Sequence, residues 1–124
     1  DHQPSDLVAS SILNLNGMTT TTLTDEETKL RYEVPYVIWA NYDIGEETNA
    51  DTSANYLGLE VLQKAGITLP AYQDFLKETK EKYPILSAVR ITNQDSEETS
   101  KKKESEGLNL YQQLQYYLLF DLEE

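Results

Sequence analysis

The sequence predicts an α/β fold in which helices pack on a small sheet. Residues 34–40, Val-Pro-Tyr-Val-Ile-Trp-Ala, form a β-branched and aromatic run without polar alternation, which is typical of a strand buried on both faces. Two amphipathic stretches, 52–65 and 70–83, have the apolar spacing of helices that cover such a sheet. With 124 residues in total, the chain is expected to form a single fragment, 1–124, equal to one domain or a large part of one.

The composition excludes several classes of protein. The net charge is -12, whereas a nucleic-acid groove needs Lys and Arg facing phosphates, so no nucleic-acid partner is expected. Adhesion of this chain to an anionic membrane surface is disfavoured for the same reason. The absence of cysteine excludes disulfides, zinc–thiolate sites and thiol nucleophiles. No run approaches the roughly 20 apolar residues of a membrane span, so the chain itself is expected to be soluble.

The first third of the chain contains one predicted helix. Residues 6–16 follow the N-cap candidates Ser5 and Asp6, and Gly17 is expected to stop the helix. The segment of about 16–31 is rich in threonine and acids, which predicts a flexible surface loop. The expected apolar side of the helix consists of Leu7, Val8, Ile12 and Leu15.

The two central helices have clear end signals. Gly66 is expected to end the helix at 52–65. Pro70 fits the first position of the helix at 70–83, and Pro84 cannot continue it. The N-cap candidates of the first of these helices are Asp51, Thr52 and Ser53.

The carboxy-terminal third predicts a strand, a loop and a helix. Residues 85–92 alternate apolar and polar or small side chains, as a strand does. Residues 93–107 are almost wholly polar, which predicts an exposed loop, and a helix is expected at about 108–120. Two strands are too few to cover both faces of 34–40, so further strands are expected upstream of this sequence, unless a small α/β domain compensates in another way. The residues of the last helix expected to face inward are Leu110, Leu114, Tyr117 and Leu118.

Asp1-His2 is the candidate metal-binding pair. A carboxylate and an imidazole placed together can bind one divalent ion, although an exposed terminal dipeptide is the simpler interpretation of these two residues alone. His2 is the only histidine, so no Ser/His/Asp triad has a natural partner. Because the chain starts at Asp1 without an initiating Met or a signal peptide, it is expected to be part of a longer gene product.

Other polar or aromatic candidates favour structural interpretations. The acids Asp43, Glu46, Glu47 and Asp51 lack the spacing of a calcium loop, so a solvated acidic loop is expected. Trp39 could stack on a ligand, but within an apolar strand it is expected in the core. Lysines 101–103 stand between acids, which indicates a solvated loop.

Five segments, in chain order, match the segments of one enzyme family. They are 1–5 (Asp-His-Gln-Pro-Ser), 34–43 (Val-Pro-Tyr-Val-Ile-Trp-Ala-Asn-Tyr-Asp), 52–57 with 64–67, 70–76, and 114–117 with Phe120-Asp121. Together they resemble lipoteichoic-acid-synthase-like phosphoglycerol transferases of the sulfatase and alkaline phosphatase superfamily. This resemblance implies the carboxy-terminal part of an alkaline-phosphatase-like α/β sandwich.

The resemblance also implies a chemistry. In this family a threonine or serine nucleophile attacks the phosphorus of a phospholipid head group, and Mn²⁺ or Mg²⁺ activates the nucleophile. Asp1 and His2 match two metal ligands, whereas the nucleophile, the remaining acidic ligand and the head-group site lie upstream. No catalytic residue is therefore expected in this chain, which alone should be inactive and hold no metal stably.

The parent protein implied by the resemblance is anchored in a bacterial membrane, with its catalytic domain outside the cell and a glycan or polymer as acceptor. Phosphoglycerol transfer, phosphoethanolamine transfer and sulfate-ester hydrolysis share this scaffold and stay open as activities. The alternative is a stand-alone extracytoplasmic binding or interaction module that uses its sheet and tyrosine-rich helices as a surface. An isolated fragment would also favour a homodimer that covers its exposed sheet.

Overall fold

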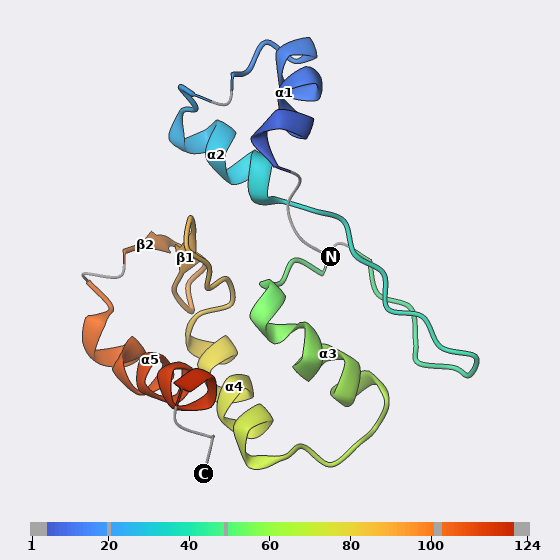
Figure 1. Ribbon diagram of the computed structural model, residues 1–124. Helices are drawn as coiled ribbons and strands as arrows, with labels where there is room; N and C mark the ends of the chain where they lie inside the picture. Colours follow the sequence, from blue (N-terminus) through green and yellow to red (C-terminus); the bar gives the residue numbers. More distant parts are fainter. Residues whose placement is uncertain (1–4, 20, 49, 101–102, 121–124) are drawn as a thin grey trace. The chain divides into compact units, whose positions relative to one another are not determined.

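A computed structural model describes residues 5–19, 21–48, 50–100 and 103–120. Within these ranges the chain is mostly helical, with five α-helices, one 3₁₀ turn and one two-stranded antiparallel hairpin (Figure 1). The chain divides into two compact units, Asp1–Val37 and Ile38–Glu124. The predicted combination of helices with a small sheet is confirmed in this coarse form, while no larger sheet forms among the described residues.

The first unit contains helices α1 (Asp6–Leu15) and α2 (Asp25–Tyr32). The predicted helix at 6–16 is confirmed within one residue: α1 starts after Ser5 and its C-cap is Asn16, directly before Gly17, whose φ of 74° closes the last turn. Its buried residues are Ala9 and Leu13. The predicted apolar side was wrong, since all four of its members are exposed: Leu7, Val8, Ile12 and Leu15.

The predicted loop of about 16–31 is wrong in its second half, where residues from Asp25 onward form helix α2. A capping box starts this helix: the Glu27 backbone N–H donates to Thr24 Oγ1 at 3.2 Å, and the Thr24 backbone N–H donates to Glu27 Oε2 at 2.8 Å. The same hydrogen bonds lower the pKa of Glu27. An ion pair of 2.8 Å between Arg31 and Asp6 joins α2 to α1. Local capping and this pair therefore hold a helix that buries no residue of its own.

The predicted strand at 34–40 was wrong for the chain as it stands. These residues form neither strand nor helix, and Figure 1 shows the chain after α2 as an extended ribbon. Val37 is 87% exposed and Trp39 is 79% exposed, so Trp39 lies outside the core. A strand buried on both faces needs neighbouring strands, and the described residues supply none at this position.

The second unit contains η1 (Ala54–Tyr56), α3 (Leu57–Lys64) and α4 (Ala71–Lys82). These elements confirm the two predicted central helices within one or two residues at each end. Gly66 has a φ of 67° and ends α3, while the Ile67 N–H donates to the Leu62 carbonyl oxygen at 3.0 Å in a Schellman closure. Ser53 is the N-cap residue of η1.

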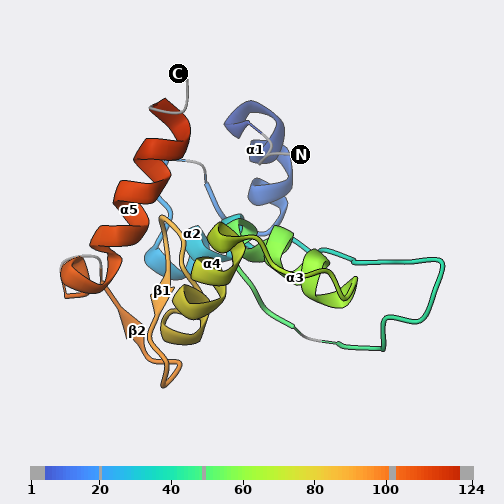
Figure 2. The same cartoon turned by 90° about the horizontal axis from the view of Figure 1, so that it is seen from below.

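A small hairpin follows α4. Strands β1 (Ile91–Thr92) and β2 (Glu98–Thr99) pair antiparallel (Figure 2). Leu86 forms an isolated antiparallel bridge with Ile91. The predicted strand at 85–92 is thus confirmed only at its end. The predicted loop at 93–107 contains β2 and the beginning of α5 (Ser105–Phe120).

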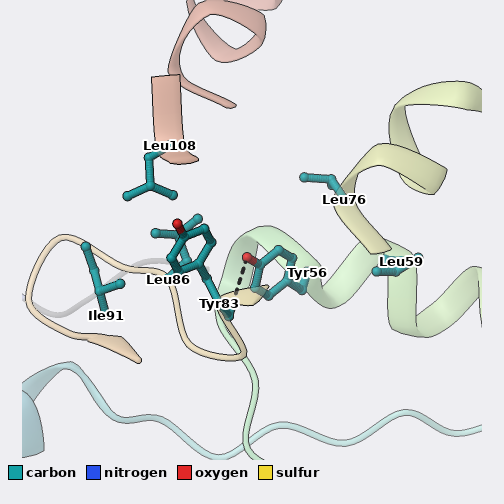
Figure 3. Close-up of a cluster of buried hydrophobic side chains, with 7 residues drawn as sticks. All are labelled: Tyr56, Leu59, Leu76, Tyr83, Leu86, Ile91 and Leu108. Atoms are coloured by element: carbon teal, nitrogen blue, oxygen red, sulfur yellow. Dashed lines mark hydrogen bonds between the residues drawn. The ribbon is translucent and has the colours of Figure 1, made fainter. Parts of the chain in front are cut away.

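Helix α5 confirms the last predicted helix but turns a different side toward the core. Leu108 is buried, and Tyr111 packs against the buried cluster. Three of the residues expected to face inward, Leu110, Tyr117 and Leu118, are exposed, and Leu114 is half-buried. The core of the second unit consists of Tyr56, Leu59, Leu76, Tyr83, Leu86, Ile91 and Leu108 (Figure 3).

Candidate functional site

The predicted metal pair, Asp1 and His2, lies outside the described residues. Within the described ranges no group of three His, Cys, Asp or Glu side chains is close enough together to hold a metal ion. The residues that the structure describes therefore do not supply the rest of a Mn²⁺ or Mg²⁺ site.

The acidic segment after Trp39 is a solvated loop, as predicted. Its four acids are exposed. Asp43 Oδ1 accepts a hydrogen bond from the Gly45 N–H at 2.9 Å, which closes a local turn. Glu47 Oε2 accepts from Lys64 Nζ at 2.7 Å, and this hydrogen bond and charge lower the pKa of the Glu47 carboxyl. Two of the four acids thus organise the loop and tie it to α3.

A tyrosine network links the elements of the second unit. The Tyr56 hydroxyl donates to the Tyr83 backbone carbonyl oxygen at 3.0 Å, which joins η1 to the end of α4 (Figure 3). Asn55 Nδ2 donates to the Tyr111 hydroxyl at 2.9 Å, and this bond joins η1 to α5. Gln115 Nε2 donates to the Tyr72 hydroxyl at 2.8 Å and joins α5 to α4. The network therefore satisfies the polar ends of large rings that are otherwise packed among apolar groups.

The network perturbs the ionisation of its phenols. Burial is the main cause that raises the pKa values of Tyr56, Tyr72 and Tyr83. For Tyr83 the neighbouring Glu104 adds to the increase, because the Tyr83 hydroxyl donates to Glu104 Oε2 at 3.0 Å. A phenol that is neutral and already donating is a poor general base, so these groups are suited to structure rather than to proton transfer.

An open cleft of about 230 Å³ lies beside Tyr83. Its lining is polar, and its volume is below the roughly 300–1,000 Å³ of ordinary small-molecule sites. The hydrogen bond between Tyr83 and Glu104 occupies two of its polar groups. The cleft therefore has no arrangement that points to a reaction. The lining residues are Lys82, Tyr83, Asn93, Gln94, Asp95 and Glu104.

Helices α3 and α4 are also joined by an ion pair between Glu60 and Lys80. Both side chains are largely shielded from water, so their charges act through a lower dielectric than surface pairs do. Neither this pair nor the tyrosine network was predicted from the sequence. The relevant signal was present, since nine of the twelve aromatic residues are tyrosines, but the sequence does not say which hydroxyls meet which partners.

Lysines 101 and 102 lie outside the described residues, and Lys103 is exposed as expected of a solvated loop. No helix within the described ranges is long and apolar enough to cross a membrane. Comparison of the chain with protein-family models, with curated proteins and with solved structures found no match.

Proposed function

We propose that this chain is the carboxy-terminal portion of an extracytoplasmic, metal-dependent transferase domain. The activity is phosphoglycerol transfer, or one of two reactions on the same scaffold, phosphoethanolamine transfer and sulfate-ester hydrolysis. The observation that carries this proposal is the order of the five sequence segments from Asp1-His2 to Phe120-Asp121. The finer fold proposed for the parent is an alkaline-phosphatase-like α/β sandwich.

The exposed apolar run after α2 supports the proposal. Val37 and Trp39 lie in water although their segment has the composition of a doubly buried strand. Each large apolar side chain left in water forgoes about 1.5–3 kcal/mol of burial free energy. A parent sheet with strands on both sides of 34–40 would recover that free energy.

In this proposal Asp1 and His2 bind the divalent ion of the parent. Bound there, Mn²⁺ or Mg²⁺ would activate the upstream hydroxyl nucleophile and stabilise charge on the phosphoryl oxygens. Asp1 would supply a hard carboxylate oxygen and His2 a neutral imidazole nitrogen. Two ligands do not fix the geometry of an ion, so the pair acts only together with ligands from the rest of the domain.

The test uses the full-length parent protein in detergent with phosphatidylglycerol and Mn²⁺. Release or transfer of the phosphoglycerol group is expected, with a loss of at least about 100-fold in His2→Ala and Asp1→Asn, since each removes a metal ligand. Asp43→Asn is the matched control, because Asp43 is an exposed acid that only closes a turn. Unchanged activity of His2→Ala, or phosphodiester cleavage by residues 1–124 alone, would contradict the proposal.

A stand-alone binding or interaction module is the second candidate. It is favoured by the second unit, whose helices and hairpin enclose a core of their own. The gene upstream of Asp1 discriminates the two candidates. Membrane spans followed by a domain with a threonine or serine nucleophile favour the enzyme, while a signal peptide joined directly to Asp1 favours the module.

A further inference from the structure

The dipeptide Asn16-Gly17 lies where helix α1 ends, and its two residues can react with each other. Asn16 is the C-cap residue of α1, and Gly17 follows it with a φ of 74°. Both residues are exposed to water. Asn16 is also the only asparagine in the chain that glycine follows. A reaction that needs this pair of residues can therefore occur at this position alone.

The pair carries the atoms of an intramolecular reaction. The backbone nitrogen of Gly17, after hydroxide has removed its proton, attacks the side-chain carbonyl carbon Cγ of Asn16. The new C–N bond closes a succinimide ring, while the side-chain nitrogen takes a proton from water and leaves as ammonia. Water then opens the ring at either carbonyl carbon, which leaves aspartate or isoaspartate at position 16. A side chain on the following residue hinders the attack, whereas glycine has no Cβ.

The surroundings of Gly17 leave room for the ring. A Cβ atom built at Gly17 meets no atom within 4 Å. The constraint on the reaction is the hydrogen bonding that closes α1: the Gly17 N–H donates to the Asn14 carbonyl oxygen at 3.1 Å, and the Met18 N–H donates to that of Leu13 at 2.9 Å. These bonds must open before the Gly17 nitrogen reaches Asn16 Cγ. Because helix ends open at low free-energy cost, the closure slows the reaction without preventing it.

Conversion of Asn16 changes the hydrogen bonding and the charge at the end of α1. Asn16 Nδ2 donates to the Ile12 carbonyl oxygen at 3.0 Å. A carboxylate only accepts hydrogen bonds, so this bond is lost. The carboxylate also places a negative charge beside the last carbonyl oxygens of the helix, where the helix dipole is already negative. All residues of α1 are described by the structure, and its last turn has no basic residue to offset that charge.

We propose that Asn16-Gly17 is a site of non-enzymatic modification, at which Asn16 converts through a succinimide to aspartate and isoaspartate and thereby loosens the end of α1. The reaction consumes water and needs no enzyme or cofactor. Isoaspartate also lengthens the backbone by one methylene group, so the hydrogen bonds from Gly17 and Met18 cannot form again with the same spacing. This modification does not depend on the transferase proposal.

Ageing of the full chain in mildly alkaline buffer, followed by peptide mapping with mass spectrometry, tests the proposal. Asn16 is expected to convert before any other asparagine, into aspartate and isoaspartate that electron-transfer fragmentation distinguishes. Gly17→Ala should leave Asn16 intact over the time in which half of the unsubstituted chain converts. Gly66→Ala is the matched control: Gly66 ends α3 with a similar φ of 67° but follows Ala65, so Asn16 should convert at an unchanged rate.

Two further measurements separate the chemistry of the pair from the stability of α1. In concentrated urea the helix is absent, and Gly17→Ala should still prevent conversion. After anion exchange isolates the converted native chain by its added charge, the amides of Gly17 and Met18 should exchange hydrogen about tenfold faster, because a hydrogen bond is lost and the dipole is opposed. Earlier conversion of another asparagine overturns the proposal, as does an Asn16 that converts only in urea. Unchanged amide exchange overturns the loosening of α1.

Discussion

The hydroxyl of Tyr56 donates a hydrogen bond to the backbone carbonyl oxygen of Tyr83 across a distance of 3.0 Å. Both residues are buried, and they lie 27 positions apart in the sequence, at the start of α3 and the end of α4. The bond satisfies a carbonyl that the end of a helix leaves without an intrahelical partner. It therefore connects two helices through the most buried part of the second unit.

Removing this hydroxyl should cost more than an ordinary hydrogen bond. Tyr56→Phe keeps the ring but leaves the Tyr83 carbonyl oxygen unsatisfied in the core, so we expect a loss of about 1–3 kcal/mol in the free energy of unfolding. Tyr56→Ala should cost about 3–5 kcal/mol, because it also leaves a cavity. Urea unfolding followed by circular dichroism measures both. Tyr116→Phe is the control, since Tyr116 is exposed, and a similar loss there would contradict the assignment.

Gly107 should tolerate no side chain although it stands in a helix. A Cβ atom built there overlaps the Tyr83 hydroxyl oxygen. Tyr83 is buried and bonded to Glu104, so its ring cannot swing away at low cost. Gly→Ala in a helix normally stabilises by up to about 1 kcal/mol, yet Gly107→Ala is expected to destabilise the second unit. The free energy of unfolding measures the sign.

Two further variants test whether the cost of Gly107→Ala comes from the overlap with the Tyr83 hydroxyl or from placing alanine in any helix of this chain. Gly58→Ala in α3 places its Cβ 3.7 Å from Gln73 Nε2, an ordinary contact, so it should be neutral or stabilising. In a Tyr83→Phe background the oxygen is absent, and Gly107→Ala should lose most of its cost. If the cost is the same in both backgrounds, the Tyr83 hydroxyl is not its cause.

Alkaline pH should destabilise the second unit through its buried tyrosines. Burial raises the pKa values of Tyr56, Tyr72 and Tyr83 above the ordinary value of 10.0, so the folded state favours their neutral forms. A tyrosine whose pKa is higher in the folded than in the unfolded state contributes its full stabilisation below pH 10. This stabilisation is lost as the pH rises from 10 toward the pKa of the tyrosine in the folded state. The melting temperature should fall across that pH range. The phenolate absorbance of these tyrosines should appear at a higher pH than that of free tyrosine. In Tyr56→Phe the fall should be shallower, and an identical slope would contradict the role of this residue.

Helix ends were predictable because their causes are local. Gly17 and Gly66 close α1 and α3 through positive φ values that other residues resist, and Pro70 precedes α4 directly. The Thr24 to Glu27 spacing carried an equally local signal for α2. The predicted loop of about 16–31 rested only on the threonine-rich, acidic composition of the segment and was wrong where α2 forms.

Features that depend on distant partners were not predictable. The inner side of α5 is selected by bonds to Asn55 and Tyr72, which lie 56 and 43 positions away from their partners. The sequence of α5 has apolar residues on two sides, and its spacing alone does not show which of the two sides faces the core. The run at 34–40 failed for a related reason, because a strand exists only with neighbours to pair with. Of the candidate site, the acidic loop was predicted correctly, while Asp1-His2 lies outside the described residues.

Trp39 should behave in solution as an indole surrounded by water. It is the only tryptophan and is 79% exposed, so its fluorescence reports on the extended segment alone. We expect emission at the wavelength of free N-acetyltryptophanamide and quenching by neutral acrylamide at a similar rate. Iodide should quench less, because the exposed acids Asp43, Glu46 and Glu47 follow closely in the sequence and repel an anion.

The salt dependence of this quenching separates charge from burial. In 0.1 M sodium chloride, charges more than about 10 Å apart are largely screened from each other. The repulsion between iodide and the acids should therefore weaken, and the rate of iodide quenching should approach that of the free indole. The double substitution Asp43→Asn, Glu46→Gln should raise the rate of iodide quenching in the same way at low salt. Blue-shifted emission that resists acrylamide at every salt concentration would instead mean that the 34–40 segment has found a partner surface and is buried there.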